Sequence, residues 1–270
     1  MEPIISITVY SLAFIAILSY AVAALLLTQQ FFQKSATSPT VGRWLASGAA
    51  LAHVILIYLL IAAGDGQNMS LTNVLTLVAW IVTVSILVSS WYFRSNLLLP
   101  VVFGFAFLSI ILSLIVPGSY AVSIGLKPGL IVHITLSLLA YGALIMVMLY
   151  ALQVEYINTR LKRKDSDLLH SSLPPLMMLD QILIKLLYTG TLLLLIAVIS
   201  GAVFLDNMFD RQHVHKTTLT LIAFCLYVFT AFANHRWGWR GRPIFILVAI
   251  GSGLLTLAYF GSRFVREILL

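Results

Sequence analysis

The sequence predicts an all-α membrane protein, a polytopic helix bundle of about eight transmembrane helices with both termini outside. Of its 270 residues, 61% are hydrophobic and only 9% are charged, whereas a soluble domain carries roughly a quarter charged residues. Runs of about 20 apolar residues recur along the chain and alternating strand patterns do not, so helices are expected to cross the bilayer. We expect residues 1–270 to form a single integral membrane domain.

Eight apolar segments account for the predicted helices. Each is long enough to cross a hydrocarbon core of about 30 Å at about 1.5 Å per helical residue. The predicted spans are residues 4–27, 44–63, 71–92, 97–116, 129–152, 186–205, 216–233 and 244–262. The first is longer than the apolar core of a cleavable signal peptide and follows the acidic Glu2, so we expect it to be retained.

Positive charge sets the predicted orientation. The chain has a formal net charge of +7, with 16 Lys and Arg residues. Most of them fall in loops that lie inside when the N-terminus is outside, which favours both termini outside. In a soluble protein this basicity would suggest nucleic acid, but here the charges set topology. We therefore expect membrane lipids, and no nucleic acid, as partners.

The longest loop, 153–185, is predicted to be cytoplasmic. Helical character is expected to continue past the fifth span through Asn158–Arg160. Pro174 and Pro175 suit the start of a new helix, because proline is tolerated in a first turn. We expect the amphipathic stretch Leu176–Lys185 to lie near the inner interface before the sixth span begins.

Several polar and aromatic groups are interpreted as caps and anchors. Asn73 and Trp80 are expected near the outer face, as a helix-capping amide and an interfacial aromatic. The arginines and tryptophans of residues 234–243 (NHRWGWRGRP) are typical of an anchor at the inner face. The alternative for that stretch is contact with an anionic headgroup or a haem propionate. The small residues Ser200–Ala202 permit close helix contact.

His133 is the residue that points most directly to a function. An ionisable side chain inside an apolar span is costly and is therefore a functional candidate. In the predicted orientation His133 lies about 6 Å below the outer end of its span, and His215 begins the seventh span on the same side. Two imidazoles at similar depth could ligate a haem iron; the alternative is one packing and one interfacial histidine. His53, about 15 Å deep, is either a deeper haem ligand or a packed imidazole.

Catalysis is not expected. The sequence lacks HExxH, paired cysteines and the hydrolase, kinase and Rossmann signatures. With Cys225 as its one cysteine, the chain has no internal thiol–disulfide chemistry to offer. His213 and His215 have the spacing of a metal pair, but two histidines alone are a weak signal.

Several stretches of the sequence, in order along the chain, indicate a family resemblance in addition to the spacing of the histidines. They are NMSLTNVLTLVAW (68–80), HITLSLLAYGALIMVMLYALQ (133–153), LPPLMMLDQILIKLLYTG (173–190), VHKTTLTLIAF (214–224), GWRGRP (238–243) and LAYFGSRFV (257–265). These stretches resemble the cytochrome c assembly (CcsA/HemX) family of membrane proteins, most of all its YpjD-like subgroup. The resemblance covers roughly the whole chain.

The resemblance implies a haem-associated protein of the bacterial inner membrane. Relatives handle haem at the outer face for attachment to apocytochrome c, and by this likeness His133 matches the first outer haem histidine. Ser200–Lys216 contains no tryptophan, where the family has a tryptophan-rich loop, and the sequence ends at Leu270 without the second outer histidine that the family carries after the eighth span. These departures imply an accessory or regulatory role in haem biology. From their similar depth, we expect His133 and His215 to be the iron ligands of a haem bound between them.

Candidate partners are cytochrome c assembly or haem-biosynthesis proteins. Two alternatives remain. The first is a non-catalytic factor that binds or stabilises a partner protein through the cytoplasmic stretch Glu155–Asp180. The second is a small-molecule transporter, which has little support because no predicted span holds a carboxylate that might couple to a proton or sodium ion.

Overall fold

The computed structural model describes residues 2–33, 39–62, 67–92, 97–116, 118, 121–122, 128–163, 175–205, 214–261 and 264. Within these residues, eight helices are long and apolar enough to cross a membrane. The prediction of an all-α bundle of about eight transmembrane helices is thereby confirmed. The location of the termini and the assignment of the whole chain to one membrane domain stay predictions.

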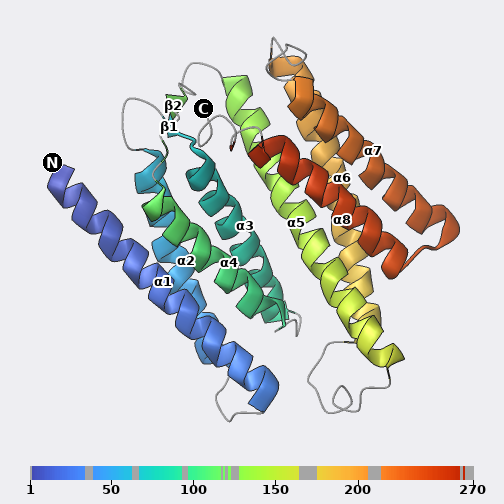
Figure 1. Ribbon diagram of the computed structural model, residues 1–270, viewed down its shortest axis with the longest axis horizontal. Helices are drawn as coiled ribbons and strands as arrows, with labels where there is room; N and C mark the ends of the chain where they lie inside the picture. Colours follow the sequence, from blue (N-terminus) through green and yellow to red (C-terminus); the bar gives the residue numbers. More distant parts are fainter. Residues whose placement is uncertain are drawn as a thin grey trace. The chain divides into compact units, whose positions relative to one another are not determined.

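The chain packs as two compact units, and the first contains Met1–Ser123 with Ser171–Pro174. Its helices are α1 (Glu2–Gln33), α2 (Pro39–Ile61), α3 (Leu71–Tyr92) and α4 (Leu98–Ile115). Helices α1 and α3 each pack against both α2 and α4 (Figure 1). Two short strands, β1 (Gln67–Asn68) and β2 (Ala121–Val122), pair antiparallel beside them.

Polar side chains of α3 tie the first unit together. The indole Nε1 of Trp80 donates to the carbonyl oxygen of Ala50 at 2.9 Å. Both residues lie near the middle of their helices, so Trp80 joins α2 to α3 at mid-length, where the sequence suggested an interfacial aromatic. Asn73 donates to the carbonyl oxygens of Asn68 at 3.0 Å and Leu60 at 3.3 Å. Because Leu60 is in the last turn of α2, this amide caps the end of α2.

The second unit contains Ile124–His170 and Pro175–Leu270. It consists of α5 (Pro128–Lys162), α6 (Leu176–Phe204), α7 (Val214–Trp237) and α8 (Arg242–Thr256), followed by a π-helical turn, η3 (Leu257–Gly261). Helices α5 and α7 each pack against both α6 and α8. Successive helices run in opposite directions, so α5 and α7 begin at the end of the unit where α6 and α8 finish (Figure 1).

Helices α5 and α6 extend beyond the predicted spans. As expected, α5 continues past Arg160, and Pro175 immediately precedes α6. The stretch Leu176–Lys185 forms the first turns of α6 rather than a separate interfacial segment. It contains no proline or glycine, so nothing in it breaks the helix before the apolar run.

Small residues bring α5 and α6 into close contact. A Cβ atom at Gly190 would come within 2.8 Å of Cδ2 of Leu144 on α5. Farther along α6, Ser200 and Gly201 are buried, whereas Ala202 is exposed. The close approach at Gly190 keeps the two helix axes near each other, so that side chains of α5 can reach the backbone of α6.

Candidate functional site

His133, in the second turn of α5, reaches across to α6. Its Nδ1 lies 3.1 Å from the carbonyl oxygen of Ala197 and 3.1 Å from Oγ of Ser200. The Ser200 hydroxyl donates to the same carbonyl oxygen at 2.8 Å. A carbonyl oxygen only accepts, so the neutral imidazole carries its hydrogen on Nδ1 and donates it towards α6.

This hydrogen bonding leaves the second nitrogen of His133 available. Within the described residues Nε2 has no hydrogen bond, and the side chain is half-buried. Histidines that ligate metals usually donate their other ring N–H to a carbonyl, a carboxylate or water, which fixes the tautomer and the ring orientation. His133 therefore has the arrangement of an imidazole prepared to offer Nε2 to a metal.

Phe204 packs against α5 one helical turn before His133. Gly129 lies one turn before His133 on the same face of α5. A Cβ atom at Gly129 would meet Cδ1 of Phe204 at only 2.4 Å, so the phenyl ring lies directly against the backbone of α5. Phe204 is 46% exposed, and it gives the site one aromatic wall that a flat ligand could also contact.

His215 lies at the same end of the second unit as His133. It is the second residue of α7, and α5 and α7 both begin at this end (Figure 1). Its side chain is exposed, and no contact found among the described residues joins it to His133. His213, which has the spacing of a metal pair with His215, is outside the described residues.

His53 belongs to the first unit and is fully buried. Its Nδ1 lies 3.4 Å from the hydroxyl of Tyr20, and the two rings are T-shaped at 5.8 Å. Tyr20 also contacts Phe103. The Nε2 atom is buried without a hydrogen-bond partner among the described residues, which costs about 1–3 kcal/mol. His53 thus combines tight packing with an unsatisfied nitrogen.

Within the described part of the chain, no three His, Cys, Asp or Glu side chains are grouped so that they could hold a metal ion. A metal held only by protein side chains would need three or four such ligands. Haem differs, because its porphyrin supplies four of the iron ligands and the protein adds one or two. The arrangement around His133 fits that smaller requirement.

Sequence reasoning found His133 but missed the side chains that prepare it. Ser200 was noted only as a small residue, and Ala197 takes part through its backbone. Gly129 and Phe204 carry no chemical signal of their own. The axial register of α5 against α6 determines which α6 residue lies opposite His133. Helix packing sets that register, so the sequence alone does not give it.

A family model described as "Cytochrome C assembly protein" matches residues 41–270 of the chain. The chain belongs to the cytochrome c assembly family. It is 32% identical over 259 residues to the inner membrane protein YpjD of Escherichia coli strain K12. The aligned region covers 95% of this chain and 98% of that protein. The YpjD proteins of two other Escherichia coli strains match equally well.

An uncharacterized 28.8 kDa protein of Azospirillum brasilense is 31% identical over 140 residues, or 51% of this chain and 52% of that protein. No solved structure was found to match the chain. The relatives and the eight helices together make this a multi-pass protein of the inner membrane. The resemblance inferred from the sequence is confirmed.

Proposed function

We propose that this protein binds haem in an accessory role, at the end of the second unit where α5 and α7 begin, with His133 as an iron ligand. The observation that carries the proposal is the hydrogen bonding of His133. Its Nδ1 is held by Ala197 and Ser200, and its Nε2 is left to bind iron. Membership of the cytochrome c assembly family supports a haem-related role, because cytochromes c are haem proteins.

His215 is the second proposed ligand, and the end of the unit that carries both histidines is proposed to face outside. His215 is exposed at the start of α7, where a bound group can reach it without disturbing the fold. His53, in the first unit, is a separate candidate for a deeper haem contact, and its side chain has no exposed surface. Neighbouring side chains would have to move before a porphyrin reached it.

The chain's own contribution is binding and orientation, and we propose no catalytic step. Bound haem supplies a redox-active iron. His133 supplies the imidazole, Ser200 and the Ala197 carbonyl hold its orientation, and Phe204 offers an aromatic surface beside it.

A visible absorption spectrum of the purified protein tests the proposal. With added hemin, the wild-type protein should show a Soret band that weakens in His133→Ala and in His215→Ala. His235→Ala is a matched control, because His235 is also exposed but lies in the last turn of α7, at the opposite end of the unit. Folded wild-type protein that gives no band after hemin addition would refute the proposal.

Ser200→Ala tests whether the orientation of the His133 ring matters, because the variant keeps the imidazole and removes one of its hydrogen-bond partners. This change removes one of the two oxygens near Nδ1 and leaves the Ala197 carbonyl in place. Loss of such a partner typically weakens a metal site by about 10–100-fold, and with one partner remaining we expect about tenfold weaker hemin binding. An unchanged hemin affinity in folded Ser200→Ala would show that the α6 contacts do not prepare the ligand.

The length of α5 favours a second candidate function, in which a partner protein binds the loop predicted to be cytoplasmic. At 35 residues, α5 is about 52 Å long, well beyond a hydrocarbon core of about 30 Å. The excess carries Arg160 and Lys162 in its last turn. Deleting residues 164–172 should release a cytochrome c assembly or haem-biosynthesis partner while leaving the hemin spectrum intact. Retention of such a partner by the shortened protein would count against this function.

A further inference from the structure

The turn between α7 and α8 presents a cluster of exposed arginines. Arg236, Arg240 and Arg242 are all exposed, and we call residues 236–242 the basic turn. Since α7 ends at Trp237 and α8 begins at Arg242, the turn joins two membrane-spanning helices and must lie at a membrane surface. Arg240 pairs with Asp180 of α6, with 3.5 Å from Nε to Oδ2.

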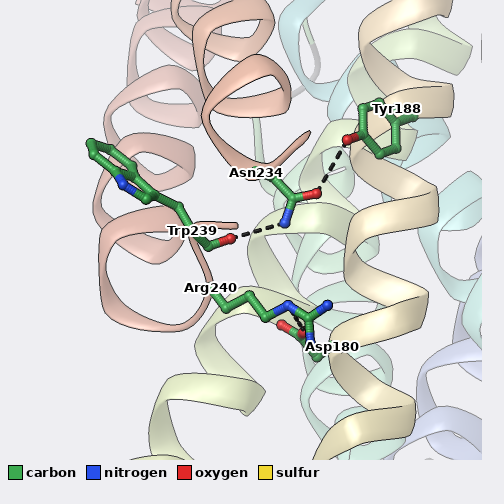
Figure 2. Close-up of polar contacts among 5 residues, drawn as sticks. All are labelled: Asp180, Tyr188, Asn234, Trp239 and Arg240. Carbon is green, nitrogen blue, oxygen red and sulfur yellow. Dashed lines mark hydrogen bonds and ion pairs between the residues drawn. The ribbon is translucent and has the colours of Figure 1, made fainter. Parts of the chain in front are cut away.

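The basic turn is fixed to α6 at two points, as Figure 2 shows. The amide Nδ2 of Asn234 donates to the carbonyl oxygen of Trp239 at 2.9 Å. The hydroxyl of Tyr188 on α6 donates to Oδ1 of the same Asn234 at 3.1 Å. The Asp180–Arg240 pair is the second link. The arginines are therefore presented by a turn with a defined conformation.

Two glycines make this conformation possible. Gly238 has φ +66° and Gly241 has φ +65°, values that other residues adopt only at a cost. Gly238 directly follows the last residue of α7, and its N–H donates to the carbonyl oxygen of Asn234 at 3.0 Å. Gly241 precedes the first residue of α8.

Exposed aromatic rings lie beside the arginines. Trp237 packs edge-on against Phe232 at 5.6 Å and contacts Trp239, also at 5.6 Å. Trp237 is 55% exposed and Phe232 is 52% exposed. Tryptophan favours the level of the lipid headgroups, where one side of the ring meets acyl chains. The basic turn thus joins positive charge to an apolar surface at the height where a phospholipid has its phosphate.

Arg240 is held so that most of its guanidinium remains free. The ion pair with Asp180 uses Nε, while the Arg240 side chain is 66% exposed and that of Asp180 only 12%. The terminal N–H groups of an arginine match the geometry of a phosphate. The first turn of α8 contains no acidic residue that would repel an anion.

We propose that the basic turn binds the headgroup of an anionic phospholipid. Arg236, Arg240 and Arg242 supply the charge that selects an anionic over a zwitterionic headgroup, and Trp237 and Phe232 contact the acyl chains. The occupant is a lipid rather than a free anion, because the charges adjoin an exposed aromatic surface on a membrane-spanning helix. This site does not depend on haem binding.

Native mass spectrometry of the purified full-length protein, titrated with phosphatidylglycerol or phosphatidylcholine, tests the proposal. Phosphatidylglycerol should be retained preferentially. Arg236→Gln and Arg242→Gln should each weaken its retention about fivefold. Lys162→Gln is the matched control, since it removes one exposed positive charge from the end of α5. Equal retention of the two lipids, or an equal loss in the control, would overturn the proposal.

Asp180→Asn gives a test in the opposite direction. This change removes the negative charge beside Arg240, so phosphatidylglycerol should bind at least as tightly as in the wild type. A partly unfolded variant could not produce that result. Weaker binding by folded Asp180→Asn would show that the link to Asp180, rather than the net positive charge, governs lipid binding, and would count against selection of the headgroup by charge. Competition of the lipid by inorganic phosphate at comparable concentration would show that the turn is a simple anion site and would overturn the choice of a lipid.

Discussion

Replacing Gly190 with alanine should destabilise the second unit, because α5 and α6 are in contact at this position. A Cβ atom at Gly190 would lie 2.8 Å from Cδ2 and 3.2 Å from Cγ of Leu144. Leu144 has no exposed surface, so its side chain cannot swing into open space. The two helices must separate by about 0.6 Å to restore an ordinary contact of about 3.4 Å, which in a close-packed interior disturbs the neighbouring contacts.

Two effects of opposite sign determine the size of this loss. Overpacking of this kind costs about 1–3 kcal/mol. Alanine in place of a helical glycine returns about 0.5–1 kcal/mol. Gly190→Ala should therefore lower the free energy of unfolding by about 1 kcal/mol, within limits of about 0 and 2.5 kcal/mol. Gly253→Ala isolates the second effect, because a Cβ atom at this helical glycine of α8 would have nothing within 4 Å.

Equilibrium unfolding of both variants in mixed micelles measures the difference. Since the two changes share the gain in helix propensity, Gly190→Ala should be less stable than Gly253→Ala by the overpacking cost alone, about 1–3 kcal/mol. Gly190→Ala should also weaken hemin binding, because a wider separation stretches the contacts of His133 with α6. The reasoning fails if Gly190→Ala is as stable as Gly253→Ala.

Three further changes probe individual contacts. Gly241→Ala forces alanine to φ +65° and ψ −129°, a region that residues other than glycine rarely adopt, and should lower the free energy of unfolding by about 1–3 kcal/mol; no loss would mean that the turn relaxes freely. Trp80→Phe removes the donor to Ala50 and should cost about 0.5–1.5 kcal/mol without altering hemin affinity, and a changed affinity would contradict a purely structural role. Tyr20→Phe removes the hydroxyl that lies 3.4 Å from Nδ1 of His53. Because this hydrogen bond is long, the free energy of unfolding should fall by less than about 1 kcal/mol. A larger fall would show that the hydrogen bond is stronger than its length indicates.

The number of helices was predictable because each apolar run has the length that a bilayer demands. The ends of the helices were less so. At α6 the apolar run predicted a span that begins at residue 186, after an amphipathic stretch at the inner interface, yet the helix is continuous from Leu176. The pairing of β1 with β2 was not foreseen, because strands of two residues are too short to show a period.

Of the candidate site, only His133 was predictable from the sequence, because it stands out by its own residue type. The cost of an imidazole in an apolar helix singled out His133. Its partners could not be found in this way, because a backbone carbonyl at Ala197 leaves no trace in the sequence. The interfacial position expected of Trp80 rested on the typical place of tryptophan in membrane proteins, and a carbonyl at Ala50 satisfies the indole N–H equally well.

His53 and His133 show why burial alone does not identify a ligand. Both are imidazoles within apolar helices, and the sequence marks each as costly. His53 has no exposed surface and leaves Nε2 unbonded inside the packed interior, so a ligand could satisfy that nitrogen only after the side chains around it move. His133 is half-buried, and its bonded Nδ1 orients the ring while Nε2 stays open. Because His133 is half-buried and its Nε2 is unbonded, we propose His133 rather than His53 as the first haem contact.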